Sequence, residues 1–208
     1  MEPIVLRSQT VVLSPLSADH AAALAEAAAE SRDQFQYTRV PNGVDEARRY
    51  IEAALADQEA GRRMPFAIVW NGRVVGSTSY LDIQRWRWPA GSPLQRTDQP
   101  DAVEIGATWL SASAQRTRCN TESKLLLLSQ AFDRWEVYRV SFKTDERNAR
   151  SRRAIERLGA AFEGVLRNHR LRYNTTPVEP RNTAVYSITD ADWPGIKRGL
   201  EQRLDITR

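Results

Sequence analysis

The residues best suited to chemistry follow a predicted strand near the middle of the chain. The strand covers Val103 to Leu110, and a short polar segment joins it to a helix. Such a junction offers several backbone N–H groups at the positive end of a helix dipole, an arrangement that binds phosphate without needing a particular side chain. Arg116 and Arg118 add positive charge, and Asn120 or Thr121 is the predicted N-cap. Taken alone, the segment also fits an ordinary strand–loop–helix connection.

The elements before this segment predict a strand, two helices and a hairpin. Residues near 4–13 alternate as a strand does, and Ser17 caps an alanine-rich helix that runs to about Glu30. Residues 45–59 carry apolar side chains at helical spacing. Asn71-Gly72 separates two apolar runs, and this dipeptide supplies the positive φ angles of a two-residue hairpin turn.

The second half of the chain alternates strands and helices. We predict strands at 103–110, 138–143, 162–167 and 184–188, helices at 120–135 and 148–158, and a terminal helix from about 190. Residues 87–99 and 173–182 predict surface loops that interrupt one domain. This order predicts an α/β protein of the α+β type, with a mixed sheet flanked by helices.

Two motifs occur at a defined separation in these elements. The first is Arg-Thr-x-x-Asn-Thr-Glu at 116–122, after a strand that ends in Trp-Leu, and the second is Asn148-x-x-Ser151, eight residues before Gly-Ala. Together they resemble the GNAT superfamily of N-acetyltransferases, above all its RimJ/RimL-like branch, which acetylates ribosomal-protein N-termini. The resemblance is tightest over residues 103–167. It implies the GNAT fold, a central mixed sheet of about six to seven strands, in a single domain spanning 1–208.

The resemblance also implies an acetyl-CoA site on the first motif. The diphosphate would lie on loop amides, and the pantetheine would pair with the strand end where it splays from the strand at 138–143. The residues assigned to acetyl-CoA are Trp109, Leu110, Gln115, Arg116, Thr117, Arg118, Cys119, Asn120, Thr121, Asn148 and Ser151. The superfamily places glycine where Arg118 stands, and a non-glycine residue disfavours positive φ. We therefore predict either a negative φ at Arg118 or a wider loop.

Acetyl transfer to an amine needs a base, because amines are mostly protonated at neutral pH. The resemblance implies Glu104 in this role, whereas a solvent-facing or ion-paired structural carboxylate is the alternative. His169, expected in a loop, is a rival base. Many superfamily members protonate the leaving thiolate with a tyrosine, but Ile155 occupies that position. Ser151, one turn earlier, would instead donate a hydrogen bond to the sulfur.

Two further residue groups allow other interpretations. Cys119 at a helix start suggests a covalent acetyl-enzyme, yet it lies in the phosphate segment and not near the expected thioester. Aromatic residues of the first helices and of the 87–99 loop could shape the acceptor site or simply belong to the core. They are Phe35, Tyr37, Trp86 and Trp88.

The composition bears on which kinds of binding partner the protein is expected to have. The net charge is +4, but acidic residues are interleaved throughout, so the charge balance alone does not identify a partner. A basic nucleic-acid-binding protein is a further alternative, although we expect no nucleic-acid partner. No stretch approaches the roughly 18 unbroken apolar residues that span a bilayer, so we expect no membrane partner. A single cysteine fits a reducing cytoplasm and offers no metal cluster. The predicted function is transfer of acetyl from acetyl-CoA directly to a primary amine, such as a protein N-terminus, an amino acid or another small amine. A catalytically silent acetyl-CoA-binding or sensing module is the alternative, and the resemblance allows a homodimer.

Overall fold

The computed structural model describes residues 3–95, 99–172 and 177–204. Within them, eight strands form one sheet in the order β1-β2-β3-β4-β5-β6-β8-β7. The strands are β1 (Leu6–Arg7), β2 (Val11–Pro15), β3 (Arg63–Trp70), β4 (Arg73–Gln84), β5 (Ala102–Leu110), β6 (Arg139–Asp145), β7 (Ala161–Arg172) and β8 (Glu179–Thr189). The α-helices are α1 (Ala21–Ala29), α2 (Val44–Glu59), α3 (Cys119–Ser129), α4 (Ala149–Glu156) and α5 (Trp193–Arg203).

The sheet is mixed, as predicted, with one strand more than the expected six to seven. All paired neighbours are antiparallel except β5 and β6. The extra strand arises because the segment predicted as one strand at 4–13 folds back on itself as β1 and β2. None of the described helices is both long enough and apolar enough to cross a lipid bilayer.

The hairpin prediction at Asn71-Gly72 is confirmed. Asn71 has φ 49° and Gly72 has φ 78°, the pair of positive angles that lets the turn follow the twist of β3 and β4. The prediction that Ser17 caps the alanine-rich helix is wrong in its position, because the N-cap of α1 is His20. Ser17 lies one turn earlier, where its backbone N–H and hydroxyl both lie 3.0 Å from His20 Nδ1. It begins the short 3-10 helix η1 (Ala18–His20) that leads into α1.

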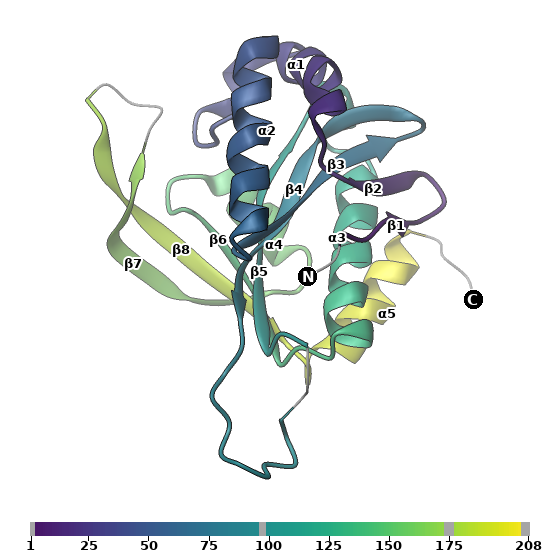
Figure 1. The fold of residues 1–208 in the computed structure, drawn as a ribbon, viewed down its shortest axis with the longest axis vertical. Helices are drawn as coiled ribbons and strands as arrows, with labels where there is room; N and C mark the ends of the chain where they lie inside the picture. Colours follow the sequence, from purple (N-terminus) through teal and green to yellow (C-terminus); the bar gives the residue numbers. More distant parts are fainter. Residues whose placement is uncertain (1–2, 96–98, 173–176, 205–208) are drawn as a thin grey trace.

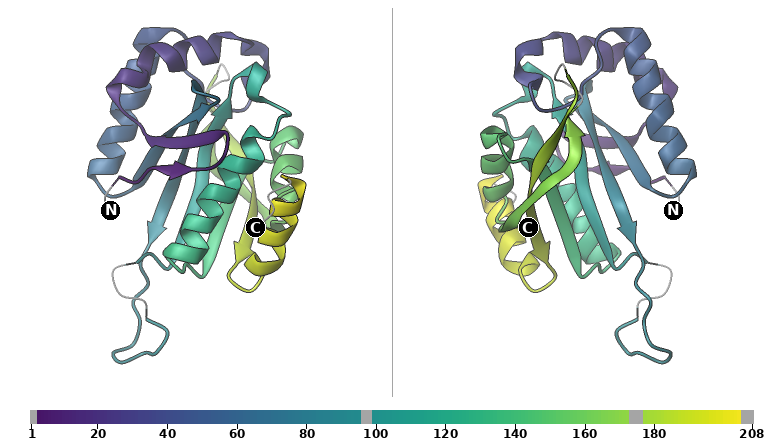
Figure 2. Two further views of the ribbon diagram at one scale, coloured as in Figure 1. Left: turned by 90° about the vertical axis from the view of Figure 1, so that its right-hand side faces the viewer. Right: turned by 90° about the vertical axis from the view of Figure 1, so that its left-hand side faces the viewer.

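Helices cover the sheet on both faces (Figures 1 and 2). The helices α1 and α2 bury mostly alanine, together with Leu24 and Ile51, against one face, where Ala67 and Trp109 meet them. The helices α3, α4 and α5 bury the larger apolar side chains of the main core, including Leu127, Ile155 and Leu200. Figure 1 shows the β7–β8 hairpin extending from this body, with the loop after β4 projecting beyond the sheet.

Strand β5 diverges from β6 part-way along its length. The two strands pair only where residues 102–104 of β5 face residues 139–141 of β6. Past that point β5 carries a bulge against β4, because Ser77 faces Trp109 while Ser79 faces Gly106, and Ala107 has φ 48°. A bulge bends its strand, so the outer half of β5 leaves β6 and stays with β4. The splay predicted between these strands is present.

Close packing of β4 on β5 explains one glycine. A Cβ atom on Gly76 would stand 2.1 Å from the Trp109 carbonyl oxygen, a distance that no side chain tolerates. The Trp109 carbonyl therefore points toward β4 and away from the divergence.

Several predicted boundaries are wrong. The strands predicted at 162–167 and 184–188 extend over Ala161–Arg172 and Glu179–Thr189, because they pair with each other along this length, and the helix predicted at 148–158 ends at Glu156. The helix predicted at 120–135 begins at Cys119 and ends at Ser129, and a π-helical turn, η4 (Gln130–Arg134), replaces its last part. The end of the loop predicted at 173–182 belongs to β8, which begins at Glu179. Residues 173–176 of that loop, and residues 96–98 of the loop predicted at 87–99, lie outside the described residues.

Candidate active site

The segment between β5 and α3 adopts a tight turn in which one arginine, Arg116, has a positive φ angle. Arg116 has φ 59°, whereas Arg118 has φ −67° and is the N-cap of α3. The prediction of a negative φ at Arg118 is confirmed, and the positive φ angle occurs two residues earlier. The predicted caps are wrong: Asn120 and Thr121 lie inside the first turn of the helix.

This turn leaves a row of backbone donors unused. The Thr117 hydroxyl donates to the Ala114 carbonyl at 2.7 Å and accepts from the Cys119 N–H at 3.2 Å. Glu122 makes the first N–H bond of the helix ladder, to the Arg118 carbonyl. Among the described residues, no acceptor is present for the backbone N–H groups of Arg116, Thr117, Arg118, Asn120 and Thr121. These five donors, at and before the start of α3, form a site that favours an anion.

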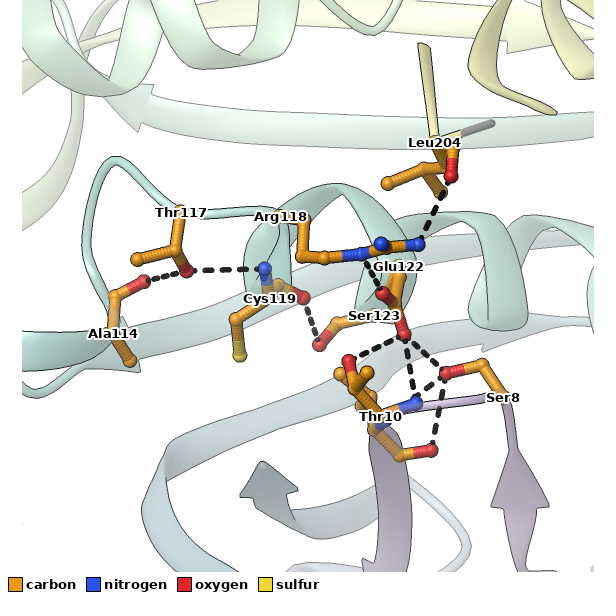
Figure 3. A network of polar contacts seen from close by, with 10 residues as sticks. Ser8, Thr10, Ala114, Thr117, Arg118, Cys119, Glu122, Ser123 and Leu204 are labelled. Atoms are coloured by element: carbon orange, nitrogen blue, oxygen red, sulfur yellow. Dashed lines mark hydrogen bonds and ion pairs between the residues drawn. The ribbon is translucent and has the colours of Figure 1, made fainter. Parts of the chain in front are cut away.

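A buried carboxylate anchors the turn from below (Figure 3). Glu122 is 1% exposed and accepts from the Ser8 hydroxyl at 2.6 Å and the Thr10 hydroxyl at 2.9 Å. It also pairs with the Arg118 guanidinium, which donates to the Leu204 carbonyl at 3.0 Å. The Arg118 side chain is therefore held in the protein, and its contribution to an anion would come through its N–H group.

A second arginine connects this turn to α4. Arg150 donates to the Gln115 side chain at 3.0 Å and to the Gln34 carbonyl at 2.8 Å, and Gln115 in turn donates to the Leu110 carbonyl at 2.7 Å. Gln34 lies in the 3-10 helix η2 (Arg32–Phe35). The carbonyl of Leu110, unlike that of Trp109, points away from β4. A polar bridge thus joins the two sides of the divergence, and the sequence motifs did not single out Arg150.

The second motif begins α4 as expected. The Asn148 side chain accepts the Ser151 N–H at 3.0 Å, which makes Asn148 the N-cap. Among the described side chains, none forms a hydrogen bond with the Ser151 hydroxyl. Ile155, where a tyrosine was expected from the superfamily, is 8% exposed and packs in the main core.

Glu104 occupies a buried position beside the divergence. It is 2% exposed, and its carboxylate lies over Gly106, where an added Cβ would stand 3.0 Å from Oε1. Lys143 donates to the carboxylate at 2.8 Å, and Arg170 lies 3.6 Å from it. Glu104 is therefore not solvent-facing. It is ion-paired, and its carboxylate is directed along β5 toward the bulge.

Comparison with known proteins places the chain in a family. The acetyltransferase (GNAT) domain family matches residues 10–161. The chain is a GNAT acetyltransferase.

Solved structures agree with this assignment. A protein from T. thermophilus described as an acetyltransferase is 31% identical over 98% of either chain, with a TM-score of 0.79. A GCN5-related N-acetyltransferase from Brucella melitensis is 25% identical, with a TM-score of 0.77 over 97% of this chain and 86% of that one. RimJ from Mycobacterium smegmatis, solved with CoA-disulfide, has the same fold at 18% identity, with a TM-score of 0.75 over 96% of this chain and 93% of its own. No curated protein matches.

The surroundings of Cys119 in this acetyltransferase do not favour a covalent acetyl-enzyme. Cys119 is fully buried, and burial raises the pKa of its thiol to about 12. A thiol in that state is almost entirely protonated at neutral pH and is a poor nucleophile.

The predicted loop position of His169 is wrong, because it lies on β7. His169 is exposed, and slight desolvation together with the nearby cations Arg170, Lys143 and Arg181 lowers its pKa. The imidazole is therefore neutral near pH 7, so it keeps the protonation state of a base.

Three of the four aromatic residues considered for the acceptor site make packing or hydrogen-bond contacts with other side chains. Phe35 packs edge-on against Trp109, with ring centroids 6.0 Å apart. Trp86 stacks on Tyr138, and the Trp88 indole donates to Asp101 at 2.7 Å. These contacts fix the base of the loop after β4. Tyr37 is half-buried.

Sequence reasoning missed a buried cation in this acetyltransferase. Lys124 on α3 is 5% exposed, and its ammonium donates to Thr108 at 2.7 Å, inside the bulge of β5. The Thr78 hydroxyl oxygen lies 2.8 Å from the Thr108 hydroxyl oxygen and 3.4 Å from the Lys124 ammonium nitrogen. Only the tertiary structure reveals this role, because a lysine in an amphipathic helix normally faces solvent.

Proposed function

We propose that this GNAT acetyltransferase binds acetyl-CoA along the turn at 115–121 and the outer half of β5, and transfers the acetyl group directly to a primary amine in a ternary complex. The row of five unaccepted N–H groups carries the proposal. A diphosphate supplies acceptors for such donors at the positive end of α3. The Leu110 carbonyl faces the divergence, so it is available to a pantetheine amide once Gln115 moves aside.

Glu104 acts as the base in this proposal. The acceptor arrives as an ammonium ion, since an α-amino group has a pKa of about 7.7–8.0. Glu104 removes the proton, the amine lone pair attacks the thioester carbon, a C–N bond forms, and the C–S bond breaks. The electron pair leaves on the coenzyme A sulfur, and the second proton, which the new amide nitrogen must lose, passes to this thiolate. The Ser151 hydroxyl donates a hydrogen bond to the sulfur.

Binding of coenzyme A is the first test. Calorimetric titration of the folded protein should show saturable binding, and the absence of heat up to millimolar coenzyme A would refute the proposal. Saturable binding without acetylation of any amine in a broad panel, followed by mass spectrometry, would instead favour the silent binding module.

The role of Glu104 is tested by the isosteric substitution Glu104→Gln. We expect kcat to fall on the order of 10²- to 10⁴-fold, the usual contribution of a general base, with the loss greatest at low pH and little change in coenzyme A affinity. Asp82→Asn is the matched control, because Asp82 is exposed and lies 3.4 Å from the same Lys143. A Glu104→Gln enzyme with wild-type kcat across pH would remove Glu104 from the mechanism.

A further inference from the structure

A second charged side chain lies in the same row of the sheet as Glu104. Arg63 on β3 faces Leu81 on β4, and Leu81 faces Glu104 on β5. Directly opposed residues of antiparallel strands project from the same face, so Arg63 and Glu104 share the face that α2 partly covers. Strands lie about 4.8 Å apart, which puts the two Cα atoms roughly 10 Å from each other.

The two charged groups approach more closely than their Cα atoms do. The Arg63 guanidinium leans onto Ser79, with Nε 2.8 Å from the hydroxyl. The Glu104 carboxylate lies over Gly106, and Ser79 and Gly106 face each other on β4 and β5. A cation and an anion therefore lie above adjacent positions of neighbouring strands, yet they form no ion pair.

Arg63 has only neutral partners in the part of the chain that the structure describes. Besides Ser79, it donates to the Tyr50 hydroxyl at 3.2 Å and lies 5.6 Å from the centre of that ring. Tyr50 in turn donates to the buried Ser77 at 3.1 Å. A guanidinium has five N–H donors in a fork that matches a carboxylate, and these contacts use two of them. The half-buried Arg63 is thus held in place with donors to spare.

The charged groups around Glu104 are mostly cations. Besides Arg63, they include Lys143, Arg170 and Arg181, whereas Asp82 is the further carboxylate that pairs with Lys143. An α-amino acid brings a carboxylate to these cationic surroundings. Its nitrogen and its carboxylate are attached to one carbon atom, so a single small molecule can present the amine to Glu104 and the carboxylate to Arg63.

Resting on the proposed function, we infer that the acceptor is an α-amino acid, whose carboxylate is bound by Arg63 while Glu104 receives the proton of its amine. Arg63 then selects the acceptor and takes no part in the chemical step. A peptide N-terminus, which has an amide in place of this carboxylate, is acetylated less well.

The test compares free amino acids with their C-terminal amides, which differ only in the carboxylate. For wild-type enzyme we expect kcat/KM to favour the acid over its amide by roughly 10- to 100-fold, the usual worth of a hydrogen-bonded charge. Arg63→Met should remove this preference by raising KM for the acid while KM for the amide stays nearly constant. Arg63→Lys, which keeps the charge without the fork, should retain part of it.

Arg62→Met is the matched control. Arg62 is the adjacent residue, but it is exposed and pairs with Asp57 at 2.6 Å, so its loss should leave the acid-to-amide ratio unchanged. Equal or better use of amides by the wild-type enzyme would overturn the inference, as would an Arg63→Met defect of the same size on acid and amide. Acetylation of amides alone leaves the proposed function intact, whereas no acetylation of any amine refutes both.

Discussion

Lys124 offers the sharpest quantitative prediction from this structure. Its ammonium lies between α3 and the sheet, where its hydrogen-bond partners are the hydroxyls of Thr108 and Thr78. Among the described residues, no carboxylate pairs with it. Burial without a counter-ion lowers the pKa of Lys124 from 10.5 to about 7, because the charged form loses its hydration.

The lowered pKa sets the size and sign of a pH effect on stability. Between about pH 7 and 10.5, the unfolded chain holds a proton on Lys124 that the folded chain has released. The free energy of unfolding therefore rises with pH through this window. A difference of about 3.5 pKa units corresponds to roughly 5 kcal/mol at 1.36 kcal/mol per unit. Below about pH 7 the cost of burying the charge is fully present, and above about pH 10.5 it vanishes.

Lys124→Met isolates this effect. The variant loses a hydrogen bond worth about 1–3 kcal/mol, but Thr78 and Thr108 stay bonded to each other, so net stabilisation of about 2–4 kcal/mol is expected at pH 6. Urea unfolding at pH 6, 8 and 9.5 should show this advantage shrinking as pH rises. Lys197→Met is the control, since Lys197 is partly exposed and pairs with Asp133 at 2.6 Å. A stability difference that stays constant from pH 7 to 10 would show that the Lys124 ammonium is not desolvated.

Two other predictions concern the start of α3. Glu122→Gln should lower the free energy of unfolding by about 2–3 kcal/mol at pH 7, because it weakens a buried, multiply bonded carboxylate, and wild-type stability in urea unfolding would contradict this. Burial by itself raises the pKa of Glu122, but hydrogen bonds from Ser8, Thr10 and Arg118 outweigh it and lower the pKa, so this stabilisation is present above the ordinary glutamate pKa and fades as pH falls through the folded value. The Cys119 thiol should resist a thiol-reactive chromogenic disulfide at pH 8 and react after unfolding, and stoichiometric labelling of the folded protein would contradict its burial.

Local sequence signals predicted most of the elements. The Asn71-Gly72 turn, the helix at 44–59 and the Asn148 cap depend on residues close together in the chain, whose backbone preferences act whatever the surroundings. The two motifs at 116–122 and 148–151 were also sufficient to indicate the family. Because these features depend on residues that are neighbours in the chain, a single sequence is sufficient to predict them.

The strand ends and the second half of α3 could not be predicted in the same way. Strand β8 begins at Glu179 because β7 supplies its partner, although Pro177 and Pro180 favour a loop. The α3 ladder gives way to a π-helical turn at Gln130. Pairing and packing with distant segments override local preference at such positions.

The same distinction between local signals and long-range packing applies to the residues of the candidate site. The sequence by itself determined that a polar turn precedes a helix, and that Glu104, Asn148 and Ser151 are available. Only the tertiary structure decided that Glu104 is buried between cations, that Lys124 lies beneath the bulge and that Arg63 shares a face with Glu104. Those relations join strands and helices far apart in the chain, and the register of the sheet and the packing of α3 bring them together, which no local spacing encodes.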